Sequence, residues 1–209
     1  AKETAKLLLQ INAIKLNPKN PFTWASGWKS PIYCDNRIIL SYPKIRKLIC
    51  DFLASLIDQN IKDYDLIAGV ATGAIGVGML VANKLDKPFI YVRSDRKKHG
   101  RKNNIEGFYK KDQKVVVIED LISTGKSSLN AVKALRERSA QILGMMALFT
   151  YQFSIAEEAF KKDNVKLQTL CDYSYLLTAA LNKKTISENQ LEDLKTWRNN
   201  PSNWTPKEN

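Results

Sequence analysis

The chain has 209 residues, of which 44% are hydrophobic and 26% charged, and this balance predicts one soluble globular domain with a sizeable core. Its apolar runs are far shorter than a membrane span and no secretory signal opens the chain, which argues against a membrane-spanning protein and favours a cytoplasmic one. The three cysteines, Cys34, Cys50 and Cys171, are widely spaced, which argues against disulfide-bonded and zinc-binding proteins. The net charge of +12 is compatible with nucleic-acid binding, with anionic small-molecule ligands, or with solubility alone.

The first predicted elements are an amphipathic helix over residues 1–14 and a β-hairpin over about residues 20–40. The expected strands of the hairpin are residues 22–24 and 32–34, joined by a tight connection over residues 26–30. Because the hairpin precedes the first strand–helix unit of the chain, we expect it to form a small hood outside the main sheet.

A second amphipathic helix is predicted over residues 41–57, with Ser41 as its N-terminal cap. A strand over residues 65–70 follows, and the small residues 71–74 lead into a helix that runs to about residue 84. Small side chains leave backbone N–H groups accessible to an oxyanion, so this loop is a candidate pyrophosphate site. A tight packing turn without a ligand is the alternative.

A third strand is predicted over residues 88–93, and a polar segment over residues 94–109 follows it. The stretch RSDRKKHGRK, which begins at Arg93, contains six Lys or Arg residues and His99, the only histidine of the chain. A long polar loop in a compact domain is either functional or disordered, and these cations suggest a lid that closes over a polyanion. A basic run is more often a solvated or nucleic-acid-binding surface, but its position directly after a strand favours the lid.

The most informative stretch is KVVVIEDLISTGKSSL, residues 114–129. Four β-branched residues predict a buried strand that ends at Glu119 and Asp120, followed by a hydroxyl-rich turn over residues 121–125 and a helix. The N–H groups at the start of that helix lack intrahelical partners and the helix dipole adds positive charge there, so a phosphate is the expected guest. The two carboxylates would repel a phosphate, and we expect them to face hydroxyl groups or a cation, such as a ribose with its Mg²⁺.

This stretch also has two alternative interpretations. Gly125, Lys126 and Ser127 also match the end of an ATP-binding P-loop, but that motif requires glycine five residues before Gly125, where this chain has Asp120. A carboxylate at the mouth of a phosphate-wrapping loop argues against a P-loop. An ordinary strand and helix joined by a polar turn is the remaining alternative.

The rest of the chain continues the alternation of strands and helices. Helices are expected to about residue 138 and over residues 154–162, 173–181 and 187–198, with strands over residues 141–151 and 165–170. This order predicts an α/β fold with a parallel central sheet flanked by helices on both faces. Ligands of such sheets bind at the carboxyl ends of the strands, where all three candidate loops emerge.

The central stretch resembles the phosphoribosyl pyrophosphate (PRPP) motif of type I phosphoribosyltransferases. It has, in this order, a hydrophobic strand, two acids, two apolar residues and the sequence S-T-G-K-S. Two further segments resemble the base-binding hairpin and the catalytic loop of one group within them, the orotate phosphoribosyltransferases. The hairpin pattern is carried by Phe22, Thr23, Ser26, Gly27, Ser30 and Pro31, and the loop pattern by Arg93, Lys97, His99 and Gly100. The resemblance covers nearly the whole chain. It implies the type I fold as a single domain over residues 1–209, and the reaction of orotate with PRPP and Mg²⁺ to give orotidine 5′-phosphate and pyrophosphate in pyrimidine (UMP) biosynthesis.

The resemblance also implies roles for individual residues. The acid pair would bind the ribose hydroxyls, the turn that follows it the 5′-phosphate, and the loop around a cis peptide at Ala71-Thr72 the pyrophosphate. The implied PRPP-binding residues are Thr72, Gly73, Arg93, Lys97, His99, Glu119, Asp120, Leu121, Ile122, Ser123, Thr124, Gly125, Lys126 and Ser127, of which Arg93, Lys97, His99 and Asp120 are the catalytic candidates. Orotate would contact Ser123, Tyr33 and the position of Ala25, and Mg²⁺ would be held mainly through PRPP and water, without direct protein ligands.

Three positions depart from the family's pattern. Ala25 stands where a lysine is frequent, Ser94 replaces the second basic residue of the loop, and no arginine follows the strand that ends near Tyr151. Lys29 is a candidate to replace the missing lysine. How the chain recognises the carboxylate of orotate is therefore left open.

The implied partners are orotate, PRPP and a second copy of the chain, because the family's catalytic loop, residues 94–109 here, reaches the active site of the neighbouring subunit. Nucleic acid and membranes are not expected partners.

A purine phosphoribosyltransferase is the alternative function within the same fold, and the hood motif argues against it. A PRPP-sensing, nucleic-acid-binding regulator is the rival from another class; the charge of +12 supports it, but no DNA-binding domain is recognisable. Whether the chain is part of a bifunctional protein that also decarboxylates orotidylate is left open.

Overall fold

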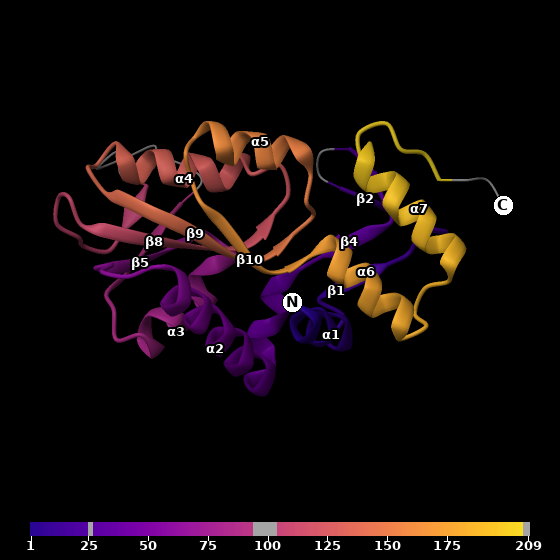
Figure 1. Ribbon diagram of the computed structural model, residues 1–209, viewed down its shortest axis with the longest axis horizontal. Coiled ribbons are helices and arrows are strands. Elements are labelled where there is room, and N and C mark those ends of the chain that lie inside the picture. The colour runs from indigo at the N-terminus through magenta and orange to yellow at the C-terminus, as the bar shows by residue number, and fades with distance from the viewer. Residues whose placement is uncertain (25–26, 94–103, 207–209) are drawn as a thin grey trace.

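The computed structural model describes residues 1–24, 27–93 and 104–206. Its centre is a six-stranded sheet in the order β10-β9-β8-β5-β6-β7 (Figure 1). The strands are β5 (Leu66–Val70), β6 (Phe89–Val92), β7 (Ile105–Glu106), β8 (Lys114–Ile122), β9 (Gln141–Thr150) and β10 (Leu167–Asp172). Neighbouring strands are parallel except for β7, which runs antiparallel to β6. The predicted α/β class with a parallel central sheet is confirmed.

Helices cover both faces of this sheet (Figure 1). The helices α2 (Pro43–Asn60) and α3 (Ala74–Lys84) lie on one face, and α4 (Lys126–Arg136) and α5 (Ser154–Lys162) on the other. The strand β8 contributes side chains to the cores on both faces of the sheet, because alternate side chains of a strand point to opposite faces. Val116 and Ile118 belong to the core beneath α2 and α3, whereas Val115 and Val117 belong to the core beneath α4 and α5. Burial on both faces explains the unbroken apolar run of this strand.

The first helix of the chain and its last two helices gather at one end of the sheet (Figure 1). The helix α1 (Lys2–Gln10) packs against α6 (Tyr173–Asn182), and α7 (Glu188–Asn199) follows α6 and lies beside the hood. The first helix is shorter than predicted. It ends at Gln10, and Asn12 has a positive φ of 55°, so the chain turns there and residues 14–16 form a strand instead.

The hood consists of two small antiparallel sheets, and the predicted pairing of residues 22–24 with 32–34 is wrong. Its strands are β1 (Ile14–Leu16), β2 (Phe22–Thr23), β3 (Lys29–Ser30) and β4 (Ile32–Cys34). The strand β2 pairs with β3, and β4 pairs with β1. Pro31, which separates β3 from β4, has no N–H group to donate, and its carbonyl accepts a hydrogen bond from the Asn17 amide at 2.7 Å. The chain therefore changes partner at Pro31.

The boundary of the second helix also differs from the prediction. Ser41 is the last residue of a 3₁₀ helix, η1 (Asn36–Ser41), and does not cap α2. That helix begins at Pro43 after Tyr42, which forms no side-chain capping bond. Proline at the first helical position has a suitable φ and no amide hydrogen that needs a partner, so α2 starts without a side-chain cap.

Two boundaries near the predicted site differ as well. The strand β8 continues through Glu119 and Asp120 to Ile122, because β9 pairs with it as far as Thr150. The polar loop predicted over residues 94–109 ends earlier, since β7 pairs with β6 and the Arg93 amide donates to the Asn104 carbonyl at 2.7 Å. Its remaining part, residues 94–103, lies outside the described residues.

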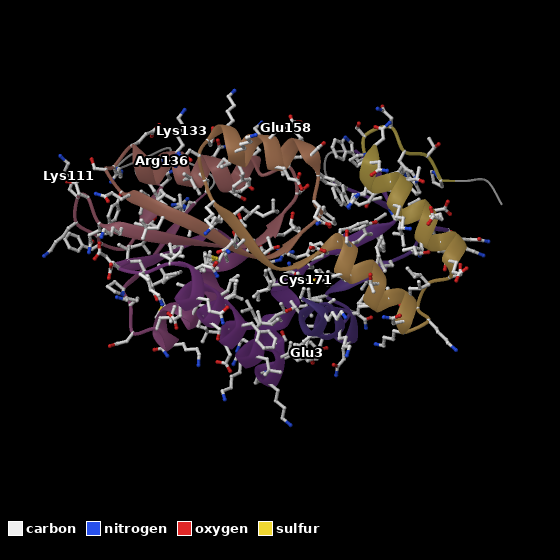
Figure 2. The ribbon with its side chains drawn as sticks, viewed as in Figure 1. Glu3, Lys111, Lys133, Arg136, Glu158 and Cys171 are labelled. Atoms are coloured by element: carbon white, nitrogen blue, oxygen red, sulfur yellow. The ribbon has the colours of Figure 1, made fainter. Side chains whose placement is uncertain are left out.

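Charged side chains cover the outer faces of the helices and loops (Figure 2). Glu3, Lys111, Lys133 and Glu158 are exposed and point away from the fold, whereas Cys171 is buried within it. Lys111 and Lys133 are therefore solvated basic residues of the surface. Within the described part of the chain, no helix combines the length and the apolar character that a membrane crossing requires.

Candidate functional site

A cavity of about 450 Å³ opens at the carboxyl ends of β5 and β8. Three segments that are distant in the sequence line it: the end of the hood, the loop before α3, and the β8–α4 connection. Nine of the residues predicted to bind PRPP are on its wall, namely Thr72, Gly73, Glu119, Asp120, Leu121, Ser123, Thr124, Gly125 and Ser127. The topology therefore brings two of the three candidate loops together around one space.

The β8–α4 connection forms a wall of hydroxyl groups and helix-terminal amides. Gly125 caps α4 with a left-handed φ of 77°, and a Cβ at this position would lie 2.8 Å from the Phe160 ring. Both the backbone conformation and the close approach therefore require glycine. The first N–H groups of α4 have no intrahelical partner, and Ser123, Thr124 and Ser127 add hydroxyl donors at the same wall. This arrangement suits a phosphate group.

Glu119 is a fixed, buried carboxyl at the base of this wall. Its side chain is only 4% exposed, and its two oxygens accept hydrogen bonds from the Ser128 hydroxyl at 2.7 Å and from the Asp120 amide at 2.9 Å. Burial, followed by the charge of Asp120, raises the pKa of Glu119 well above its usual range. Its two bonds hold this carboxyl behind Asp120, which is the more accessible member of the acid pair.

Asp120 packs directly against the loop that precedes α3. A Cβ added to Gly73 would lie 2.1 Å from Oδ2 of Asp120, so only glycine allows the carboxylate to occupy this position. The peptide between Ala71 and Thr72 in the same loop is cis, as the resemblance implied. Asp120 is also fixed from the hood side, because its carbonyl accepts a 2.7 Å hydrogen bond from Nδ2 of the buried Asn36.

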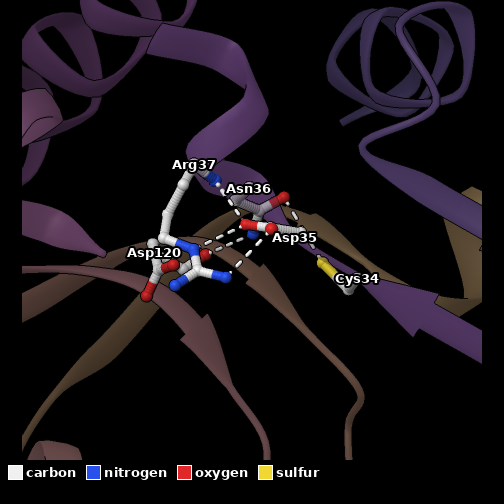
Figure 3. Close-up of polar contacts among 5 residues, drawn as sticks. All are labelled: Cys34, Asp35, Asn36, Arg37 and Asp120. Carbon is white, nitrogen blue, oxygen red and sulfur yellow. Dashed lines mark hydrogen bonds and ion pairs between the residues drawn. The ribbon is translucent and has the colours of Figure 1, made fainter. Parts of the chain in front are cut away.

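The third wall carries an ion pair that sequence reasoning did not single out (Figure 3). Asp35 accepts hydrogen bonds from Nε of Arg37 at 2.7 Å and from Nη2 at 2.9 Å, and the guanidinium lies beside the Asp120 side chain. The hydrogen bond from Arg37 is the main reason why the pKa of Asp35 is lowered. The adjacent Cys34 thiol donates to Asn36 at 3.4 Å, and burial raises its pKa well above the usual range, so it is a neutral thiol.

A second cavity, of about 350 Å³, adjoins the first. It shares part of its wall with the first cavity and is also lined by Arg93, Asn104, Lys126 and Asn130. Arg93 forms an ion pair with Glu106 at 3.3 Å between Nη1 and Oε1. Two of the cations predicted for PRPP therefore face this neighbouring space, across the Thr124–Ser127 wall from the acid pair.

Several predicted site residues are elsewhere or outside the described chain. Ile122 is fully buried in the core beneath α4 and α5, so its side chain is turned away from both cavities. Tyr33 is 41% exposed, packs against Phe22 with ring centroids 5.6 Å apart, and does not line either cavity. Ala25, Lys97 and His99 lie outside the described residues.

The described residues at the end of β9, where the family's pattern has an arginine and this chain has none, do not line the first cavity. Tyr151 is buried in an aromatic cluster with Trp24, Phe153 and Trp197. The Gln152 side-chain oxygen accepts hydrogen bonds from the Ser174 amide and hydroxyl at 3.3 and 2.9 Å. That contact holds Gln152 against α6, and Gln152 lines neither of the two cavities.

Sequence reasoning missed Asp35, Asn36, Arg37 and Ser128. The first three form the polar triplet D-N-R directly after an apolar strand, and that contrast is a signal that could have identified them. Ser128 had no comparable signal, because its hydroxyl reaches Glu119 only through the packing of α4 on β8.

The oxygen donors of the first cavity suit a hard, hydrated cation such as Mg²⁺. The cavity offers the Asp120 carboxylate and several hydroxyl groups. Among the residues that the structure describes, no three His, Cys, Asp or Glu side chains gather into a metal-binding group. The residues present therefore fit a cation that brings further ligands with its substrate.

Comparison with known proteins places this chain in a family. Residues 36–172 match the phosphoribosyl transferase domain. The chain is 54% identical to orotate phosphoribosyltransferase of Porphyromonas gingivalis, across 96% of this chain and 95% of the relative. Its fold is similar to orotate phosphoribosyltransferase from Aeropyrum pernix, with a TM-score of 0.76, 27% identity and coverage of 88% of this chain and 99% of that one. It is also similar to Leishmania donovani UMP synthase, with a TM-score of 0.80 and 28% identity. That match covers 94% of this chain and 42% of the longer UMP synthase.

Proposed function

The chain belongs to the orotate phosphoribosyltransferases of the phosphoribosyltransferase family, and from this premise we propose that it transfers the 5-phosphoribosyl group of PRPP to orotate. The products are orotidine 5′-phosphate and pyrophosphate. The observation that carries the proposal is the cavity in which the acid pair, the glycine-capped start of α4 and the Thr72-Gly73 loop meet. A ribose with a phosphate at one end and a pyrophosphate at the other needs these three kinds of group around it.

PRPP is proposed to lie with its 5′-phosphate on the amides and hydroxyls of residues 123–127. The ribose hydroxyls face Asp120, and the pyrophosphate extends toward Thr72 and Gly73, whose small side chains leave the backbone accessible. Glu119 holds Asp120 in place by accepting a hydrogen bond from the Asp120 backbone amide. Gly73 and Asn36 fix Asp120 from two further sides.

The reaction is a displacement at the anomeric carbon, in which positive charge develops on the ribose ring as in glycoside cleavage. The Asp120 carboxylate stabilises this charge because it is already oriented and partly withdrawn from water. Negative charge develops on the leaving pyrophosphate, so its departure requires positive charge beside it. Mg²⁺, bound together with PRPP, would neutralise further charge on the pyrophosphate.

The choice of base is the part of the proposal that an assay tests most simply. Purified protein would be incubated with PRPP, Mg²⁺ and, in parallel, orotate, adenine, hypoxanthine, guanine or uracil. We expect consumption of orotate alone, and no consumption when EDTA is present. Consumption of a purine base in place of orotate would contradict the proposal. Tight PRPP binding without turnover of any base would indicate a sensor.

A homodimer in which residues 94–109 complete the partner's site is also proposed, on the basis of the family resemblance. Lys97→Ala is expected to lower kcat by on the order of a hundredfold, as for loss of one preorganised transition-state contact. Two inactive variants, Lys97→Ala and Asp120→Asn, would then be mixed and allowed to exchange subunits.

If Lys97 acts on the neighbouring site, mixed dimers contain one intact site, and random exchange restores about a quarter of the wild-type activity. If Lys97 acts on the site of its own chain, every site in the mixture carries one defect and activity is not restored. Each single variant incubated alone is the control.

A further inference from the structure

The charge of the first cavity does not match the ligand proposed for it. Its described lining contains three acidic side chains, Asp35, Asp120 and the buried Glu119 with its raised pKa, and one cationic side chain, Arg37. Arg93 and Lys126 face the adjoining cavity instead. A pyrophosphate group placed beside Asp120 needs a cation on the same side of the acid pair. Within the described residues, Arg37 is the side chain in a position to supply it.

The Arg37 guanidinium is held in a fixed orientation and retains free donors. Among the described residues, its side-chain hydrogen-bond partner is Asp35, which accepts from Nε and from Nη2. A guanidinium has five N–H donors, so three remain for a ligand, two of them on Nη1. The Arg37 side chain is 57% exposed, which leaves this edge accessible from the cavity. A planar fork oriented in this way suits two oxygens of one oxyanion.

The position of Arg37 determines which oxyanion its guanidinium can bind. It lies on η1, and η1 packs against the first turns of α3: a Cβ on Gly76 would lie 2.8 Å from Cδ2 of Leu40. The same end of α3 begins at the Thr72-Gly73 loop, where Asp120 rests on Gly73. The guanidinium lies beside Asp120 (Figure 3). Arg37 is therefore on the side of the pyrophosphate loop.

We propose that Arg37, oriented by Asp35, binds the pyrophosphate group of PRPP and of the released product, from the same subunit that carries the acid pair. This inference rests on the proposed function and adds a specific residue to it. The carboxylate of orotate is the competing ligand for Arg37, because the hood residue Cys34 lines the same cavity. The two ligands are separable in a binding experiment that needs no turnover.

The test is titration of the intact protein with inorganic pyrophosphate and Mg²⁺, followed by calorimetry, for the wild type, Arg37→Gln and Arg37→Lys. We expect Arg37→Gln to weaken pyrophosphate binding at least tenfold, and Arg37→Lys to restore part of the loss, because lysine keeps the charge without the fork. Arg138→Gln is the matched control. It removes the same charge from an exposed residue that lines neither cavity, and binding should be unchanged.

Steady-state kinetics give a second measurement. Arg37→Gln should raise KM for PRPP by a similar factor and leave KM for orotate within about twofold, since a residue that binds only one substrate affects that substrate. An increase in KM for orotate with unchanged pyrophosphate binding would overturn the proposal and assign Arg37 to the orotate carboxylate. Unchanged pyrophosphate binding and unchanged kinetics would also overturn it. If the wild type does not consume orotate, the proposed function fails, and the pyrophosphate titration still decides the role of Arg37.

Discussion

Two walls of the same cavity are built in opposite ways. The β8–α4 wall comes from one continuous stretch of chain, and its geometry follows from a buried strand, a left-handed glycine and a helix start. The hood wall comes from strands of two or three residues whose position depends on distant partners. The indole N–H of Trp197 in α7 donates to the Lys29 carbonyl at 3.2 Å, and Asn36 reaches the Asp120 carbonyl of β8.

This difference separates what local sequence determines from what the tertiary fold determines. A two-stranded sheet of this size is not stable alone in water, so the hood holds its shape only while α7 and β8 hold it. The β8–α4 wall is supported by the parallel sheet on both sides. We therefore expect changes in the first wall to abolish chemistry, and changes in the supports of the hood to act mainly on the binding of the base.

The largest effect is expected from Gly73→Ala. Gly73 has an ordinary helical φ of −63°, so alanine is not strained in the backbone, but its Cβ would occupy the place of the Asp120 carboxylate. Displacement of Asp120 should lower kcat/KM for PRPP by on the order of a hundredfold or more, as removal of one preorganised charge does. Initial rates at varied PRPP measure this.

Gly76→Ala, three residues later in α3, is the matched control. Its Cβ would meet the end of the flexible Leu40 side chain at 2.8 Å, which can move aside. Activity should stay within a few-fold of the wild type, because no site carboxylate is displaced. Equal losses in the two variants would mean that α3 tolerates no added methyl group, and the specific role of Gly73 would be lost.

A smaller effect is expected from Trp197→Phe, which removes the hydrogen bond from α7 to the hood. Trp197 is fully buried and its ring centroid lies 5.5 Å from that of Trp24. We expect KM for orotate to rise several-fold with KM for PRPP nearly unchanged, together with about 1–3 kcal/mol less stability from the unpaired Lys29 carbonyl and the lost volume.

Tyr173→Phe separates loss of stability from loss of hood position. The Tyr173 hydroxyl donates to the Leu194 carbonyl at 3.0 Å, within the same aromatic cluster, and this hydrogen bond joins α6 to α7 instead of joining α7 to the hood. This variant should lose about 1–2 kcal/mol of stability and keep the wild-type KM for orotate. A matching rise in KM for orotate would show that general loosening of the cluster, and not the α7 contact, affects the base.

The smallest effect concerns the pH dependence of stability. Because burial raises the pKa of Glu119 above its ordinary value of 4.5, the folded protein retains a proton that the unfolded chain loses. The contribution of this group to the unfolding free energy therefore falls as pH rises from about 4.5 toward the folded pKa, and is constant above it. Glu119→Gln removes this dependence.

Thermal unfolding between about pH 5 and about pH 8 measures this difference. Relative to wild type, Glu119→Gln should gain stability as the pH increases, and the exposed Glu158→Gln serves as the control for a lost surface charge. Parallel pH profiles of wild type and Glu119→Gln would show that Glu119 is ionised in the folded protein with an ordinary pKa.

The parts of the molecule that the sequence predicted are those set by short-range patterns. The parallel sheet, the helix over residues 74–84 and the gathering of the acid pair with the turn after it were all expected, because strand burial and helix starts leave local signals. The hood pairing was wrong because Pro31 ends β3 and the new partner, β1, lies in a segment whose apolar residues suit a helix equally well.

The remaining site residues depended on long-range packing. Asn36 reaches Asp120 across 84 residues of chain, and Trp197 reaches Lys29 across 168. A single sequence carries no periodic signal for such contacts. Arg37 could have been suspected from its polar triplet, but its place near the Thr72-Gly73 loop required η1 to pack on α3.

The most direct test of the central claim compares the wild type with a Glu119→Gln/Asp120→Asn double variant in the presence of orotate, PRPP and Mg²⁺. The loss of orotate absorbance reports the reaction. The account predicts rapid loss with the wild type and none with the double variant, although the variant remains folded by thermal unfolding. Orotate consumption by a folded double variant at the wild-type rate would contradict the claim that this cavity, with the acid pair in its wall, is where the transfer takes place.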